Sequence, residues 1–460
     1  MLFNSYAFLL AFLPAAILVC RIVDPHPRAR IPALIALSLA FYAYWDWRFL
    51  ALLIPSIVIN WWAAKLYLAT RRGGVVTVAI AANLAVLAAF KYPAFIADNL
   101  AFATGVDFGH VGAVLPLGIS FFTFHHIMYL VDLRRGRAPE YPLDRYALYI
   151  CYFPQVLSGP LVRWNEVMHQ FGREIFTPGW QRRCAAGAMF VVLGLAQKVF
   201  LGDPLGRIID PIYEQALAGA LPDGRAWIGL AFAFQVFFDF AGYSDVAIGL
   251  ALILGVQLPR NFDAPFRASS IQEFWQSWHM TLARFLRDYV FFPLAYSGIG
   301  GREHRVTRQL VAILITMALC GLWHGAAWHF VLWGTLQGVA LIWGAVWRRY
   351  LPSPGLVLGW AATVGFFVFT IVFFRGATLD AIWRIYEGLL IPPFGVTTRE
   401  WRIIALAVFV AVVLPPSHEI VRRLTEKPRA IVALGLSALA VAVLVQIGRG
   451  ENDEFIYFQF

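Results

Sequence analysis

Long apolar runs without charged side chains constrain the fold of this chain more than any other feature. Residues 431–447 contain no charged residue, and roughly 17–25 such residues cross a lipid bilayer as a helix. A spanning segment must satisfy its own backbone hydrogen bonds, which a helix does and an isolated strand does not. The sequence therefore predicts an all-α, polytopic integral membrane protein.

The other apolar runs set the expected number of crossings. They are residues 2–20, 31–45, 75–90, 114–131, 185–201, 227–256, 310–347, 356–374 and 403–414. Residues 227–256 and 310–347 are each long enough for two crossings, so we expect about 10 to 12 transmembrane helices. The chain is 60% hydrophobic and 14% charged, which is more apolar surface than one soluble core could bury.

The basic residues indicate topology and not nucleic-acid binding, although the formal net charge is +10. Lys and Arg concentrate in cytoplasmic loops of membrane proteins. No basic residue precedes the first apolar run, whereas Arg21, Arg28 and Arg30 follow it. Four basic residues within 422–429 precede the last run, and a more acidic tail follows. Both termini are therefore predicted to be extracytoplasmic, which requires an even number of crossings.

We expect residues 1–460 to form a single membrane domain that ends in a tail at residues 448–460. The first run lacks a basic n-region and a small-x-small cleavage site, so it is interpreted as a retained crossing. No inverted repeat is evident, which counts against a secondary transporter. The cysteines, which are far apart and expected to be buried thiols, are Cys20, Cys151, Cys184 and Cys320.

Two segments depart from simple lipid-facing helices. In residues 141–178, Pro154, Gly159 and Pro160 would break an exposed helix, so a re-entrant or interfacial element is predicted, with an ordinary exposed loop as the alternative. In residues 271–292, apolar side chains recur every three or four positions and predict one helix. These side chains are Phe274, Trp278, Leu282, Phe285 and Tyr289. Ser270 and Glu273 precede them with the spacing of a capping box.

His324 is the first candidate for chemistry because it lies inside the apolar run at 310–347. An ionisable side chain at such depth is a functional candidate by default, and desolvation favours the neutral imidazole that acts as a general base. Gly321 and Gly325 flank it and predict a closely packed helix neighbour. A hydrogen-bonded structural histidine remains the alternative, and it is our interpretation of His329. The second candidate is His279, in the predicted helix at 271–292.

Other catalytic and metal signatures are missing. Neither G-x-S-x-G nor G-x-x-x-x-G-K-[ST] occurs in the chain, so the sequence predicts neither a nucleophile elbow nor a phosphate-binding loop. His125 and His126 are adjacent and point to different helix faces, so no metal site is predicted. Asp239 and Asp245 are interpreted as partners of Arg residues or as part of a polar path.

The C-terminus is rich in aromatic residues, with Phe455, Tyr457, Phe458 and Phe460 among the last six positions. An interfacial aromatic belt is one interpretation. A free end that docks in a cavity and offers the Tyr457 phenol as a nucleophile or acyl carrier is the other. The residues alone leave both open.

Several motifs together resemble the membrane-bound O-acyltransferase family. They are FQVFFDFAGYSDVAIGLALILGVQLPRNFDAPF at 234–266, IQEFWQSWHMTLARFLRDYVFFPL at 271–294, GLWHGAAWHFVLWG at 321–334, LPLGISFFTFHHIMYLVD at 115–132 and FPQVLSGPLVR at 153–163. The most similar branch is the membrane subunit of bacterial alginate O-acetylation, with its relatives in exopolysaccharide and peptidoglycan acetylation. The resemblance covers nearly the whole chain.

The resemblance implies a central chamber that the acyl donor enters from the cytoplasm. It implies that His324, in the W-H-G motif, is catalytic, and that His279 assists where many relatives have Asn or Asp. The F-x-Y-x-x-F pattern of Phe455, Tyr457 and Phe460 implies that Tyr457 receives the acyl group. Relatives typically carry Gln in place of His125, so no role is transferred to that position.

The resemblance also implies the reaction and its participants. Acetyl-CoA is the expected donor, with no permanently bound cofactor, and cofactor-binding residues are not identified. The expected partners are membrane lipid and an extracytoplasmic SGNH-type acetyltransferase that acts on a polysaccharide such as alginate. The expected location is the bacterial cytoplasmic (inner) membrane. D-Alanyl export to teichoic acid, peptidoglycan O-acetylation and a transporter without covalent chemistry remain alternatives.

Overall fold

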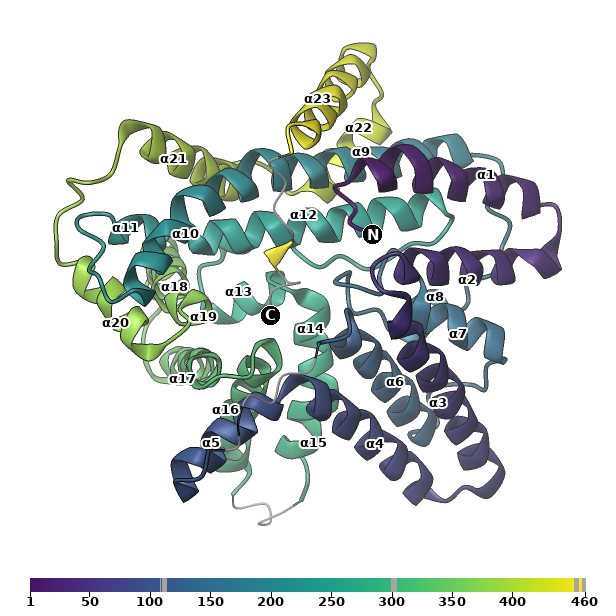
Figure 1. Cartoon of the computed structure of the whole chain (residues 1–460), viewed down its shortest axis with the longest axis horizontal. Coiled ribbons are helices and arrows are strands. Elements are labelled where there is room, and N and C mark those ends of the chain that lie inside the picture. The colour runs from purple at the N-terminus through teal and green to yellow at the C-terminus, as the bar shows by residue number, and fades with distance from the viewer. Residues whose placement is uncertain (108, 110–113, 299–303, 451–454, 457–460) are drawn as a thin grey trace. The chain divides into compact units, whose positions relative to one another are not determined.

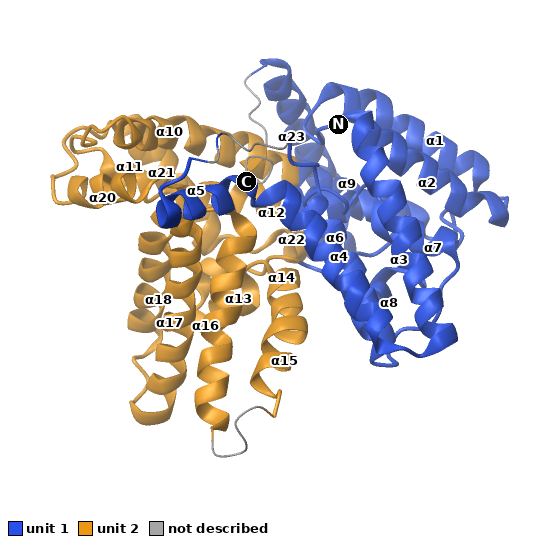
Figure 2. Cartoon of the chain, turned by 60° about the horizontal axis from the view of Figure 1, so that its bottom comes forward, with its two compact units in different colours: residues 1–193, 243–260, 421–454 blue, residues 194–242, 261–420, 455–460 orange. Residues whose placement is uncertain are grey.

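The computed structural model describes residues 1–107, 109, 114–298, 304–450 and 455–456. Every regular element in these residues is a helix (Figure 1), which confirms the predicted all-α class. The described chain separates into two compact units, and each unit combines segments that are distant in sequence (Figure 2). Unit 1 comprises residues 1–193, 243–260 and 421–454, and unit 2 comprises residues 194–242, 261–420 and 455–460.

Unit 1 contains the N-terminal helices. They are η1 (Ala7–Phe12), α1 (Leu13–Val23), α2 (Pro27–Ala43), η2 (Trp47–Phe49), α3 (Leu50–Thr70), α4 (Gly73–Lys91), α5 (Pro93–Thr104), α6 (Ile119–Arg134), α7 (Leu143–Cys151), α8 (Trp164–Val167) and most of α9 (Trp180–Gln197). It also takes the second half of α12 (Phe232–Ile253), most of α22 (Ser417–Glu426) and α23 (Ala430–Gly448).

Unit 2 contains most of the remaining helices and the first half of α12. They are η3 (Lys198–Gly202), α10 (Asp203–Leu217), α11 (Ala226–Gly229), η4 (Pro265–Arg267), α13 (Ile271–Ser277), α14 (Met280–Phe285), η5 (Leu286–Phe291), α15 (Phe292–Ala295), α16 (Arg305–His324), α17 (Trp328–Tyr350), α18 (Leu356–Thr370), α19 (Val372–Arg375), α20 (Leu379–Gly388) and α21 (Thr398–Val413).

Eight helical stretches in the described residues are long and apolar enough to cross a membrane, or nine if the bent pair α21–α22 is one span. They are Trp47–Thr70, Gly73–Lys91, Trp180–Leu217, Ala226–Ile253, Arg305–His324, Trp328–Tyr350, Leu356–Arg375 and Ala430–Gly448. This confirms a multi-pass membrane protein.

The count is lower than the ten to twelve expected, for two reasons. Residues 227–256 form one span and not two, because no breaker interrupts α12. Three expected runs fold into helices of at most 17 residues: Ala7–Val23, α2 and α6. One further span, Trp47–Thr70, was missed because Arg48, Asn60 and Lys65 interrupt its apolar pattern.

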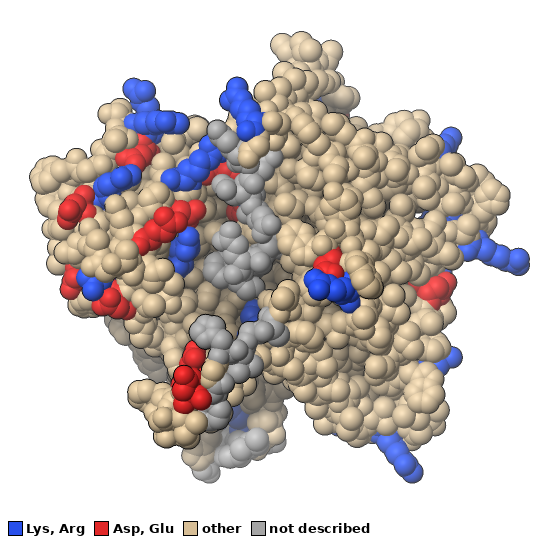
Figure 3. Space-filling view, in the orientation of Figure 1, with Lys and Arg blue, Asp and Glu red and all other residues tan. Residues whose placement is uncertain are grey.

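Large apolar side chains are exposed on the surfaces of helices that are long enough to span a membrane. Val78 on α4 and Ile431 and Leu434 on α23 are about 70% exposed or more, and charged side chains leave wide areas of one face uncovered (Figure 3). Apolar surface of this extent marks contact with a non-aqueous neighbour.

The backbone between α7 and α8 is buried, as the Pro/Gly-rich sequence predicts for a protein-covered segment. All residues from 151 to 162 are buried, and those between the two helices are not helical, so the exposed-loop alternative is wrong. A Cβ added at Gly118 (φ +76°) would lie 2.5 Å from the carbonyl oxygen of Val156. The start of α6 therefore packs directly against this buried backbone.

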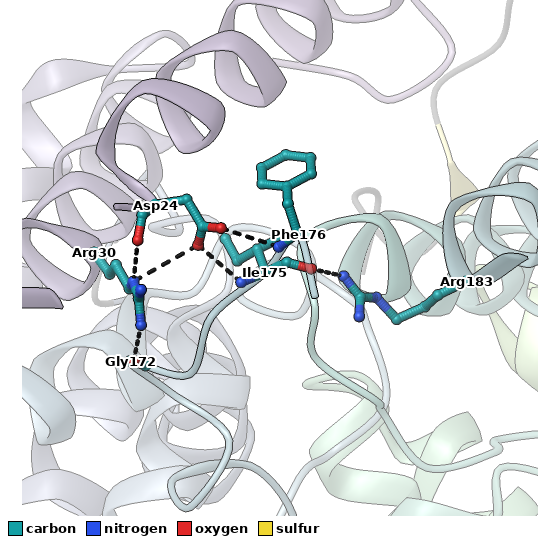
Figure 4. Close-up of polar contacts among 6 residues, drawn as sticks. All are labelled: Asp24, Arg30, Gly172, Ile175, Phe176 and Arg183. Atoms are coloured by element: carbon teal, nitrogen blue, oxygen red, sulfur yellow. Dashed lines mark hydrogen bonds and ion pairs between the residues drawn. The ribbon is translucent and has the colours of Figure 1, made fainter. Parts of the chain in front are cut away.

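Polar side chains anchor the next loop within unit 1 (Figure 4). The buried carboxylate of Asp24 accepts hydrogen bonds from the backbone N–H groups of Ile175 at 2.8 Å and Phe176 at 3.0 Å. Arg30 Nε donates to the carbonyl of Asp24 at 2.7 Å, and Arg183 donates to the carbonyl of Ile175. Backbone groups in this irregular segment are thus paired without a helix, as burial requires.

Candidate active site

Helices α16 and α17 pack with their backbones in direct contact. A Cβ added at Gly321 would overlap the carbonyl oxygen of Phe330, and one added at Gly334 would overlap the carbonyl oxygen of Met317. A Cβ at Gly325 would overlap the ring of Phe330. The glycines that flank His324 therefore permit a closely packed helix neighbour, which confirms the prediction from the small-xxx-small spacing.

His324 is the last residue of α16 and lies in an aromatic cage. Its side chain is buried, with only 5% of the residue exposed. The imidazole centroid lies 4.7 Å from the ring of Trp323, 5.6 Å from Trp333 and 5.0 Å from Phe374, all edge to face. Aromatic walls fix the orientation of the imidazole and exclude water. The following residue, Gly325, is extended and ends the helix.

His279 lies at a break between two helices, so the single helix predicted over 271–292 is wrong. Helix α13 ends at Ser277, Trp278 is extended, and α14 begins at Met280. His279 has φ 41° and ψ 51°, in the left-handed region that non-glycine residues seldom adopt. Such a conformation persists only where the surrounding structure determines it.

The predicted N-cap of this segment is present. The Ser270 side chain accepts the backbone N–H of Glu273 at 3.2 Å. The Glu273 carboxylate reaches the N–H and hydroxyl of Ser269, at 2.8 Å each, in place of the N–H of Ser270. The start of α13 was therefore readable from sequence, whereas its end was not.

Asn261 holds the turn at His279 in place. Its backbone carbonyl accepts the N–H of Met280 at 2.8 Å. Its side-chain oxygen accepts the Thr281 hydroxyl at 2.8 Å and Nδ1–H of His279 at 3.0 Å. The loop before η4 thus clamps three consecutive residues and offsets the unfavourable backbone conformation of His279. Pro259 and Pro265, on either side of Asn261, are typical of a loop, but no local pattern predicts that Asn261 holds His279.

This contact also fixes the protonation of His279. The Asn261 side-chain oxygen only accepts, so Nδ1 carries the hydrogen and Nε2 carries the lone pair. The residue is 1% exposed, and burial lowers the pKa of His279 to about 3. The imidazole is therefore neutral at physiological pH, in a form that accepts a hydrogen bond or a proton at Nε2.

One indole lies against both predicted catalytic histidines. The ring centroid of Trp323 is 6.4 Å from that of His279 and 4.7 Å from that of His324. Both histidines belong to unit 2, although 45 positions separate them in sequence. Unit 2 therefore brings two buried imidazoles to a single aromatic residue. Trp323 is not among the site residues that the sequence predicts.

The third predicted site residue, Tyr457, lies outside the described residues, as does Phe460. The two preceding residues are described and buried: Phe455 is 1% exposed and Ile456 is 5% exposed. The backbone N–H of Ile456 donates to Oδ2 of Asp239 at 2.7 Å. Phe455 and Ile456 therefore lie in the interior of unit 2.

Asp239 pairs with Lys198, whereas the sequence predicts an arginine partner or a role in a polar path. Lys198 Nζ lies 2.6 Å from Asp239 Oδ1 and 2.7 Å from Asp203 Oδ1. All three side chains are at most 4% exposed. Lys198 is the one charged residue in the apolar run at 185–201, and a charged side chain in such a run is the sequence signal for a buried partner.

Three other histidines, His125, His126 and His329, are buried, as are all the cysteines except the half-buried Cys184. His126 contacts the Tyr146 hydroxyl at 2.6 Å, and His329 Nδ1 contacts the Phe373 carbonyl at 2.8 Å. His125 is fully buried on α6 beside the ring of Tyr149, at 5.1 Å between centroids. The four cysteines are free thiols, and the described residues contain no group of three or more potential metal ligands.

Comparisons with known proteins identify the family of this chain. The model of the MBOAT, membrane-bound O-acyltransferase family matches residues 133–380, a range that includes both histidines. The chain is 32% identical over 427 residues to the peptidoglycan O-acetyltransferase of Helicobacter pylori, covering 85% of this chain and 80% of the relative. It is 35% identical over 410 residues to a probable alginate O-acetylase of Azotobacter vinelandii, covering 85% and 78%.

A teichoic acid D-alanyltransferase of Streptococcus thermophilus is more distant, at 29% identity over 238 residues, covering 51% of this chain and 57% of that relative. The family match spans more than half of the chain, and the two acetyltransferase relatives align over most of their length. This chain belongs to the membrane-bound O-acyltransferase family and is a multi-pass membrane O-acyltransferase.

Proposed function

We propose that the protein moves an acetyl group from acetyl-CoA in the cytoplasm across the bacterial cytoplasmic membrane for O-acetylation of an extracytoplasmic polysaccharide. The observation that carries the proposal is the placement of His324 and His279 against the same buried indole. The names of the relatives at 32–35% identity, a peptidoglycan O-acetyltransferase and a probable alginate O-acetylase, support acetyl as the group transferred.

His324 acts as the general base. Its imidazole removes the proton from an attacking hydroxyl, whose oxygen forms a bond to the carbonyl carbon of the acetyl thioester. The C–S bond then breaks, and the imidazolium returns the proton to the leaving thiolate, which gives free coenzyme A. The aromatic cage around His324 favours this role because the three rings hold the imidazole in one orientation.

His279 positions the reacting groups. Its ring lies beside the same indole as that of His324, and Asn261 fixes its orientation through Nδ1. A base and a positioning group on separate, rigidly held elements reduce the entropy lost on reaching the transition state. This assignment explains why a strained backbone conformation is retained at His279.

The acceptor of the acetyl group is the phenol of Tyr457, which passes it to an SGNH-type acetyltransferase outside the cell membrane. Two observations support this assignment. The two residues before Tyr457 are buried in unit 2, the unit that holds His324. Ile456 also belongs to the same apolar core cluster as Trp333 and Phe374, whose rings surround His324.

Labelled acetyl transfer to the purified protein tests the proposal. The parent chain should acquire label from acetyl-CoA, whereas His324→Ala and Tyr457→Phe should not. His329→Ala is the matched control, because it removes a histidine from the adjacent helix α17 and should retain the label. Label on Tyr457→Phe equal to that of the parent would place the acceptor elsewhere in the chain.

D-Alanyl export is the second candidate, favoured by the similarity to a teichoic acid D-alanyltransferase. It requires a thioester on a carrier protein in place of coenzyme A. If the parent chain stays unlabelled with acetyl-CoA but accepts D-alanine from such a carrier, this second function replaces the first.

A further inference from the structure

Three charged side chains form a buried cluster in unit 2. The ammonium of Lys198, in η3, faces the carboxylates of Asp203, at the start of α10, and Asp239, on α12. Apolar residues of similar size would often be at least as stabilising in such a place, so a buried ionic cluster is weak evidence for a purely structural role. A buried carboxylate also needs hydrogen bonds to its remaining lone pairs.

The C-terminal tail supplies one of those hydrogen bonds. Oδ1 of Asp239 contacts Lys198 at 2.6 Å, and Oδ2 accepts the backbone N–H of Ile456 at 2.7 Å. The ring of Phe455 lies 5.0 Å from the Lys198 ammonium, a distance at which a cation and an aromatic face attract. Two consecutive tail residues therefore contact the same charged cluster, although 217 positions separate Ile456 from Asp239.

We propose that Asp239, supported by Lys198, is a positioning residue that docks the C-terminal tail and thereby limits the reach of the Tyr457 phenol. The proposal rests on the proposed function, in which Tyr457 accepts the acetyl group. Ile456 directly precedes Tyr457 in the chain, so Asp239 acts on the residue next to the proposed acceptor. The contact at Ile456 uses the backbone N–H, whereas the contact at Phe455 uses an aromatic side chain.

The contacts of Phe455 and Ile456 with the charged cluster are weak enough for the tail to bind reversibly. The hydrogen bond from Ile456 to Asp239 and the cation–π contact of Phe455 with Lys198 are each modest interactions. They can order the tail for acyl transfer and still release it toward a partner. The apolar cluster around Ile456 adds burial without adding specificity for a charged group.

Hydrogen exchange tests docking independently of any chemistry. In the full-length protein in detergent, the Ile456 amide should exchange slowly. Asp239→Ala removes the acceptor but leaves Lys198 paired with Asp203, and it should speed that exchange about tenfold or more, the loss expected for one hydrogen bond to a charged group. Asp210→Asn is the matched control, because Asp210 lies on α10 and pairs with Arg375 at 2.9 Å. Unchanged exchange in Asp239→Ala would overturn the proposal.

A second pair of variants leaves the cluster untouched and stays informative even if Asp239→Ala does not fold. Ile456→Pro removes the N–H donor, and Ile456→Val keeps it. Acetyl label on Tyr457 should appear about tenfold more slowly in Ile456→Pro than in Ile456→Val, while both variants should remain folded and monodisperse in detergent. Equal labelling of the two variants would overturn the positioning role. A parent with a protected Ile456 amide that never acquires label would overturn the proposed function and leave docking supported.

Discussion

The side-chain oxygen of Asn261 accepts Nδ1–H of His279 at 3.0 Å across eighteen positions of sequence. This contact sets the tautomer of the imidazole, and the backbone contact from Asn261 to Met280 holds the turn on which the imidazole sits. The orientation of His279 is therefore determined by a preceding loop and not by the helices on either side.

Asn261→Ala should lower the rate of acetyl transfer about tenfold or more with little change in KM, because His279 loses the group that orients it. Asn261→Asp should retain more activity than Asn261→Ala, since a carboxylate also accepts from Nδ1–H. Steady-state kinetics on folded, monodisperse protein provide the measurement. Full activity in Asn261→Ala would show that the orientation of His279 is unimportant.

The buried imidazole of His279 should make stability depend on pH. Its folded-state pKa of about 3 lies below the value near 6.5 of an exposed histidine. The unfolded chain therefore binds a proton that the folded chain does not, and stability falls as the pH drops below about 6.5. At pH 5.5 this proton binding lowers the free energy of unfolding by about 1.4 kcal/mol. His279→Asn should remove it, which thermal unfolding of both proteins between pH 5 and 7.5 would reveal as a shallower dependence in the variant.

The contact between α16 and α17 should not tolerate a methyl group. Gly321→Ala places a Cβ onto the Phe330 carbonyl, and overpacking of this kind costs about 1–3 kcal/mol. Gly365→Ala, in α18, is the control, because an added Cβ there meets nothing within 4 Å. It should be neutral or stabilising by about 1 kcal/mol. Thermal stability in detergent distinguishes the two, and equal effects would contradict the packing described here.

Removing the lysine of the buried cluster should be costly. Lys198→Met leaves the carboxylates of Asp203 and Asp239 without their cation, and breaking a buried pair in this way costs about 3–5 kcal/mol. The triple variant with Asp203→Asn and Asp239→Asn should recover most of that loss, because the uncompensated charges are gone. Denaturation midpoints measure both effects, and a triple variant no more stable than Lys198→Met would refute this explanation.

The fold class and the burial of His324 were predictable from the sequence because both depend on local signals. Uncharged runs identify helices in lipid, and an ionisable residue within such a run, such as His324, stands out against its neighbours. The packing of α16 on α17 was predictable for the same reason, since Gly321 and Gly325 lie four residues apart on one helix.

The break at His279 and the partners of Asp239 were not predicted, and both depend on contact between residues distant in sequence. The stripe from Phe274 to Tyr289 contains no Gly or Pro, so nothing local signals the break at His279; Asn261 holds it. Likewise, the partner of Asp239 lies in η3 and at the end of the chain. Pairing of this kind cannot be read from the spacing of residues within one segment.

Anchoring of the tail at Asp239 has a consequence for kinetics. Because Ile456 is covalently part of the chain that binds it, the binding is intramolecular, with an effective concentration that a short tether typically raises to the millimolar range. A weak contact then suffices to keep the tail bound, and occupancy does not change when the protein is diluted. Each enzyme molecule would carry its own acceptor in a ratio of one to one, so sustained turnover would depend on how fast a partner unloads it.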